Sequence, residues 1–149
     1  MNIPEILIPT GLVEIVHKNS KGRILNVIKV PNLITTAGKT HIAAKIAATT
    51  NSPASVTHMA TGTGTAAAVV GDTTLATEAA RVALTATSAS TNTLTYTATF
   101  GAGVGTGALT EAGILNASSG GTLLCRTVFS VVNKAAGDSI AITWVVTVS

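Results

Sequence analysis

Apolar and polar residues alternate along much of the chain beyond residue 56, and a period of two is typical of half-buried β-strands. Segment 93–100 is the clearest case, because threonine holds every odd-numbered position and an apolar residue holds every even-numbered one. Threonine is β-branched and polar, so it suits the outer face of a sheet. The same reasoning predicts further strands at 56–61, 80–88, 109–115, 122–132 and 139–148.

A β-hairpin is predicted in the first third of the chain. Segments 12–17 and 23–30 are rich in β-branched and apolar residues, and Pro31 ends the second of them. The short connection at 18–22 contains asparagine, serine and glycine, which favour tight turns. These two strands are therefore expected to pair with each other.

Segment 36–48 predicts a helix. It is rich in alanine, the best helix former, and Ile42 and Ile46 are spaced so that they give the helix one apolar stripe. Either Thr35 or Thr36 is expected to cap the first amides of this helix. The segment that follows the hairpin is then the one clear helix in a chain of strands, although 75–83 leaves a helix open as an alternative to a strand.

The first ten residues predict an extended arm. Pro4 and Pro9 flank an apolar patch and disfavour a helix, so the arm is expected to bury this patch on a neighbouring molecule or on its own domain; the patch is Ile6, Leu7 and Ile8. Residues 11–149 then form one domain with about eight short strands, a loop at 65–78 and the helix at 36–48. This predicts an all-β fold, β-sandwich or jelly-roll-like, with one short helix after an N-terminal hairpin.

The composition favours a protein that associates with copies of itself. Charged residues make up only 10% of the 149 residues, against about 25% in an ordinary soluble domain. Hydrophobic residues make up 46%, so the chain is able to form a core and is not disordered by charge. The threonine-rich faces are flat, and few lysines lie at the sheet edges to oppose pairing with another chain. Both features favour a homo-oligomer.

Basic residues are concentrated near the N-terminus. Residues 1–45 carry six basic and two acidic groups, a net charge of +4, whereas residues 46–149 carry a net charge of −1. All four aromatic residues lie outside this basic part, so no nucleic-acid partner is expected. The uncharged run 82–110 alternates threonine with apolar residues and therefore predicts strands, not a membrane helix, and no membrane partner or signal peptide is expected.

The residues that usually carry catalysis form no recognisable site. The run 62–65 (GTGT) lacks the spacing and lysine of a phosphate-binding loop, and the alternating glycines of 101–107 match no nucleotide-binding pattern. No histidine has metal-ligand spacing with another His, with Cys125 or with an acidic pair; the histidines are His17, His41 and His58. No nucleophile elbow is present. The sequence therefore predicts no catalytic residue, no metal, no cofactor and no enzyme activity.

Glu111 lies in an otherwise apolar segment, LTEAGILN, and a charge in such a strand needs a partner. Arg126 and Arg81 are the arginines available in the β region. We expect a structural ion pair between Glu111 and Arg126. Whether the pair forms within one subunit or between two stays open at this point.

Several blocks of the chain resemble small structural proteins of tailed bacteriophages. These blocks are VPNLITTAGKTHIAAKIA, MATGTGTAAAVVGDTTLATEAAR, TLTYTATF, LTEAGILNASSGGTLLCRTVF and SIAITWVVTV, which fall within residues 11–149. Related blocks occur in capsid decoration (cement) proteins and in tail or head fibres. The resemblance implies a virion component that is made in the host cytoplasm and performs no catalysis.

One compact domain with a short arm suits a decoration protein better than a fibre, which usually needs a long shaft. The resemblance then implies a homo-oligomer on the capsid surface, expected to be a trimer, that binds the major capsid protein across subunit junctions. The expected contact residues are the arm patch Ile6, Leu7 and Ile8 and the hairpin cations Lys18, Lys21 and Arg23. The alternative is a fibre or receptor-binding module that recognises host glycans or protein.

Overall fold

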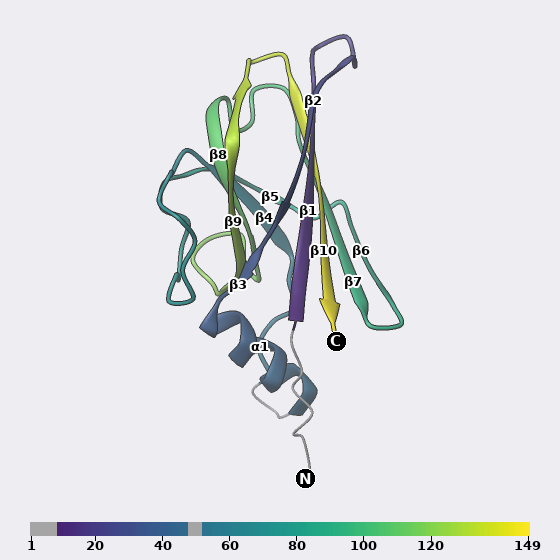
Figure 1. The fold of residues 1–149 in the computed structure, drawn as a ribbon, viewed down its shortest axis with the longest axis vertical. Coiled ribbons are helices and arrows are strands. Elements are labelled where there is room, and N and C mark those ends of the chain that lie inside the picture. The colour runs from purple at the N-terminus through teal and green to yellow at the C-terminus, as the bar shows by residue number, and fades with distance from the viewer. Residues whose placement is uncertain (1–8, 48–51) are drawn as a thin grey trace.

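The computed structural model describes residues 9–47 and 52–149, and these residues form two five-stranded antiparallel sheets. The first sheet has the order β2-β1-β10-β7-β6, with β1 Pro9–Lys18, β2 Ile24–Pro31, β6 Ala86–Ser90, β7 Thr93–Phe100 and β10 Ser139–Val148. The second has the order β3-β9-β8-β4-β5, with β3 Leu33–Ile34, β4 His58–Gly62, β5 Glu78–Ala83, β8 Gly107–Leu115 and β9 Leu123–Lys134. The helix α1, Thr36–Ala47, lies at one end of the two sheets (Figure 1). The all-β, sandwich-like class predicted from the sequence is thus confirmed.

The core lies between the facing sides of the two sheets. The period of two in β7 and β10 places their apolar side chains on this inner face, where Phe100, Ile142 and Trp144 are almost completely buried. The second sheet contributes Met59 and Ile114 to the same core cluster. The facing sides therefore hold one hydrophobic core, as alternating strands require.

One predicted strand, 80–88, is two strands in two different sheets. The backbone amide of Leu84 donates to the carbonyl of Thr57 next to β4, whereas the amide of Thr85 donates to the carbonyl of Thr97 in β7. The chain thus changes sheets between two neighbouring residues. Periodicity continues across this point, so the sequence pattern gave no sign of the change. The alternative of a helix over 75–83 is also wrong, because Glu78–Ala83 is β5.

The helix forms where it was predicted, but the apolar stripe of Ile42 and Ile46 is not the face that α1 buries. Thr35 is the cap, since its Oγ1 accepts a hydrogen bond of 2.9 Å from the Gly38 amide. Ile46 is 73% exposed, and the buried residues of α1 are Gly38 and His41. A Cβ atom at Gly38 would overlap the carbonyl of Leu124, so the bare helix backbone rests directly on β9.

The boundary of the N-terminal arm also differs from the prediction. Strand β1 begins at Pro9 and pairs with β10 from there on, so Pro9 and Thr10 belong to the sheet. The predicted contact residues Ile6, Leu7 and Ile8 lie outside the described residues.

Candidate functional site

The β1–β2 hairpin carries the three predicted contact cations at one end of the first sheet. Its turn is fixed by Asn19, whose Oδ1 accepts hydrogen bonds of 3.0 Å from the amides of both Lys21 and Arg23. Gly22 supplies the left-handed backbone, φ +78°, that the turn requires. Lys21 and Arg23 are exposed and Lys18 is half-buried, and none of the three forms an ion pair with another described residue.

Exposed apolar side chains lie next to these cations on β2. Ile24, Leu25 and Val27 are about half exposed, at 55%, 50% and 47%. Strand β2 is at the edge of its sheet and pairs only with β1 among the described strands. An apolar edge strand beside unpaired cations is a surface suited to contact with another protein.

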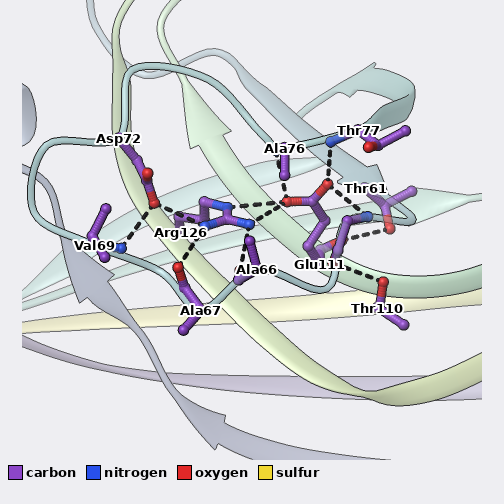
Figure 2. A network of polar contacts seen from close by, with 11 residues as sticks. Thr61, Ala66, Ala67, Val69, Asp72, Ala76, Thr77, Thr110, Glu111 and Arg126 are labelled. Carbon is purple, nitrogen blue, oxygen red and sulfur yellow. Dashed lines mark hydrogen bonds and ion pairs between the residues drawn. The ribbon is translucent and has the colours of Figure 1, made fainter.

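The second predicted site, the Glu111–Arg126 pair, is buried at the centre of a network of polar contacts (Figure 2). Nη2 and Nε of Arg126 donate to Oε2 of Glu111 at 2.8 and 3.0 Å, and both residues are at most 2% exposed. The pair forms within one chain. Arg81, the other arginine considered, pairs with Glu78 at 2.7 Å and donates to the carbonyls of Ala117 and Gly120.

Each N–H of the Arg126 guanidinium has an acceptor. Besides the two hydrogen bonds to Glu111, Nη1 donates to Oδ2 of Asp72 at 2.8 Å and to the Ala67 carbonyl at 3.3 Å. Nη2 also donates to the Ala66 carbonyl at 2.9 Å. A guanidinium has five donors, so this buried cation is fully satisfied. The sequence indicates Arg126 as a partner of Glu111 but gives no sign of Asp72, because nothing in the spacing brings Asp72 and Arg126 together.

Glu111 fixes the position of the loop that joins β4 to β5 through hydrogen bonds. Its carboxylate accepts hydrogen bonds from three loop amides, those of Gly64, Ala76 and Thr77, at 3.0, 3.0 and 2.7 Å. A Cβ atom on Gly64 would lie 2.5 Å from Oε1 of Glu111. The glycines of the GTGT run therefore make room for a structural carboxylate, which agrees with the absence of a phosphate-binding pattern.

The pKa of Glu111 is lowered in the folded chain, although burial alone raises it. The hydrogen bonds from the amides of Thr77 and Ala76 and from Arg126 outweigh the cost of desolvation. The pKa of Asp72 is lowered in the same way, against desolvation, by the Val69 amide and by Arg126. Both carboxylates are therefore charged in the native state at neutral pH.

We expect the fold to lose stability in acid. Because both folded-state pKa values lie below their ordinary values near 4, the stabilisation is fully present above about pH 5 and is lost as pH falls through the lowered values. The urea midpoint of unfolding should fall steadily below about pH 4. A midpoint that stays constant down to about pH 3 would contradict the charged network.

Other buried polar groups stabilise the end of the sandwich that carries the β1–β2 hairpin. His17 and Asp138 lie 2.8 Å apart, and the His17 hydrogen bond is the main cause of the lowered pKa of Asp138. Lys134 is 2% exposed and its Nζ donates to the Gly101 carbonyl at 2.8 Å. Sequence analysis did not single out these contacts, because the residues are far apart along the chain.

The described residues contain no group of three or more His, Cys, Asp or Glu side chains that would hold a metal ion. In the same part of the chain, no helix has the length and apolar character needed to span a bilayer. Comparisons with protein-family models, with curated proteins and with solved structures found no match to this chain.

Proposed function

We propose that this chain is a virion structural protein that decorates and cements a phage capsid, bound to the major capsid protein through the β1–β2 hairpin. The observation that carries the proposal is the combination of unpaired cations and exposed apolar side chains at one edge of the first sheet. Lys21 and Arg23 would meet acidic groups of the capsid, while Ile24 and Leu25 would bury apolar area against it. The phage resemblance supplies the class of partner.

Self-association, expected to give a trimer, fits the outer face of the first sheet. Threonines of β7 line this face, and Thr93, Thr95 and Thr97 are half-buried. The charges of Glu14 and Lys29 neutralise each other there at 3.3 Å. A face with so little net charge offers little repulsion between copies. Many modest contacts, repeated over an oligomer, would add up to firm attachment to the shell.

A glycan-binding fibre is the weaker alternative. Sugar sites usually stack the sugar on an exposed aromatic ring. All four aromatic residues of the chain lie within the described part and all are buried, at most 8% exposed: Tyr96, Phe100, Phe129 and Trp144. This burial favours a protein that works by surface contact with other proteins.

Reversing the hairpin charge should weaken capsid attachment. The double variant Lys21→Glu/Arg23→Glu is expected to bind purified capsids roughly tenfold more weakly and to lose most of the salt dependence of binding. Occupancy would be measured by co-sedimentation between about 50 and about 500 mM NaCl. Lys18 stays unchanged because it is half-buried, so its substitution would also perturb the sheet.

The matched control is Lys39→Glu/Lys45→Glu, which changes the net charge equally at two exposed positions of α1. Equal loss in both variants would show that only overall charge matters, and unchanged occupancy of the hairpin variant would refute the proposed contact. The copy number per particle separates the two functions. Hundreds of copies indicate a decoration protein, whereas a few dozen or fewer indicate a fibre.

A further inference from the structure

Four strands lie at the edges of the two described sheets, and β2 is the longest of them. Strand β3 has two residues, β6 has five and β5 has six, whereas β2 has eight. Strand β5 carries the Glu78–Arg81 ion pair, and β6 contains only alanine, serine and threonine. Long apolar edges are normally avoided, because their free backbone groups pair with other chains. Of the four edges, β2 therefore suits an added strand best.

The register of β1 and β2 shows which backbone groups of β2 face away from β1. The amide of Asn32 donates to the carbonyl of Gly11 at 3.2 Å, and the pairing continues over residues 26–31 without a register shift. Hydrogen-bonded and non-hydrogen-bonded pairs alternate in an antiparallel ladder. The N–H and C=O groups of Val27 and Lys29 therefore point to the open edge, where no described strand pairs with them.

The features that usually protect an edge do not cover these two positions. Proline blocks pairing, but Pro31 is the last residue of β2 and affects only that end. An edge lysine also opposes pairing, yet Nζ of Lys29 lies 3.3 Å from Oε2 of Glu14 on β1, so its side chain extends back over the sheet. The register shift between His17 and Lys18 lies at the turn end of the hairpin. The middle of β2 is thus open to another strand.

Charge and burial indicate what kind of strand fits this edge. Ile28 and Val30 are partly buried and pack against the core, so the added strand would place apolar side chains on that side. Lys21 and Arg23 at the turn are exposed and form no ion pair with another described residue. A second β2 would bring a further lysine and no acid, because the strand contains no Asp or Glu. Charge complementarity therefore favours an acidic segment of another protein over a second copy.

We propose that the hairpin binds its partner by strand addition: an extended segment of the capsid protein, with alternating apolar side chains and nearby acids, pairs with the open edge of β2. The main chain of this segment forms hydrogen bonds with the backbone of Val27 and Lys29, and its acids meet Lys21 and Arg23. This inference rests on the proposed function and specifies how the hairpin attaches. Backbone hydrogen bonds supply affinity, and the cations supply the choice of partner.

The variant Val27→Pro tests recognition of the backbone. It removes an N–H that points to the open edge, and that N–H does not bond to β1, so the β1–β2 ladder keeps its hydrogen bonds. The matched control is Val27→Ala, which also shortens the side chain but keeps the N–H. In co-sedimentation with purified capsids, Val27→Pro should bind at least about tenfold more weakly than Val27→Ala. The urea midpoints of unfolding check that both variants are folded.

The outcomes separate this inference from the proposed function. Equal binding by the two variants, together with a loss in Lys21→Glu/Arg23→Glu, would overturn strand addition and leave the hairpin contact in place. An unmodified chain that does not bind capsids would refute both. If the unmodified chain forms dimers in solution and Val27→Pro does not, a second copy covers the edge, and the proposed partner is wrong.

Hydrogen exchange tests the same contact in the unmodified chain and does not depend on the folding of a variant. The amides of Val27 and Lys29 should exchange fast in the free chain and at least about tenfold more slowly on the capsid. The amides of Ile28 and Val30 face β1 in the ladder and should be slow in both states. Mass spectrometry with residue-level fragmentation measures this alternation. Unchanged exchange of Val27 and Lys29 in the bound chain would overturn the proposal.

Discussion

Replacing Glu111 with alanine is expected to lower the free energy of unfolding by about 3–5 kcal/mol, because it leaves a buried guanidinium without its main counter-charge. Arg126 is 2% exposed, so little of its charge is solvated by water in the folded state. The substitution also removes the acceptor of the amides of Gly64, Ala76 and Thr77. A loss at the upper end of this range is therefore expected.

Urea unfolding measures this loss, and Glu14→Ala is the control. Glu14 also pairs with a cation, Lys29, but both side chains are partly exposed, at 39% and 64%. Its removal should cost less than about 1 kcal/mol, since exposed ion pairs contribute little. Hydrogen exchange adds a second readout, because uptake in the 63–77 loop should rise in Glu111→Ala alone. Similar costs for the two variants would show that burial of the Glu111 pair is unimportant.

The Glu111–Arg126 pair shows how far sequence reasoning reaches. A carboxylate in an apolar strand requires a counter-charge, and Arg126 is one of only two arginines beyond residue 56. The contribution of the 63–77 loop was beyond prediction, because its amides reach the carboxylate only through the path of the backbone. Asp72 was missed for the same reason, since a loop contact leaves no periodic signal in the sequence.

Strand positions were easier to predict than strand partners. Alternation in 93–100 and 139–148 reports which side chains are buried, and β7 and β10 have the predicted inner faces. Alternation says nothing about which sheet a strand joins. The segment 80–88 therefore looked continuous, although the hydrogen bonds of Leu84 and Thr85 connect it to different sheets.

The buried face of helix α1 was not predictable from its apolar stripe, for a different physical reason. An apolar stripe predicts burial of Ile42 and Ile46, yet α1 approaches β9 through Gly38, a residue that a hydrophobicity pattern ignores. Close backbone approach needs the smallest residue, and the two isoleucines are left to line a groove.

Replacing Gly38 with alanine is expected to destabilise the protein by about 1–3 kcal/mol, although alanine is the better helix former by about 1 kcal/mol. The two effects have opposite signs, so the measured sign decides which one dominates. A Cβ atom at this position overlaps backbone atoms of Leu124, which cannot rotate away as a flexible side chain would. Helix α1 must then shift from β9 and lose the packing of His41.

Gly71→Ala is the matched control for this substitution. Nothing lies within 4 Å of a Cβ atom at Gly71, and its backbone does not have the left-handed conformation. This variant should be neutral, or slightly stabilised through the lower entropy of its unfolded state. Urea unfolding compares the two, and hydrogen exchange of the α1 amides should increase only in Gly38→Ala. A stabilised Gly38→Ala variant would show that helix propensity outweighs backbone contact, and that α1 is held to the sandwich by other residues.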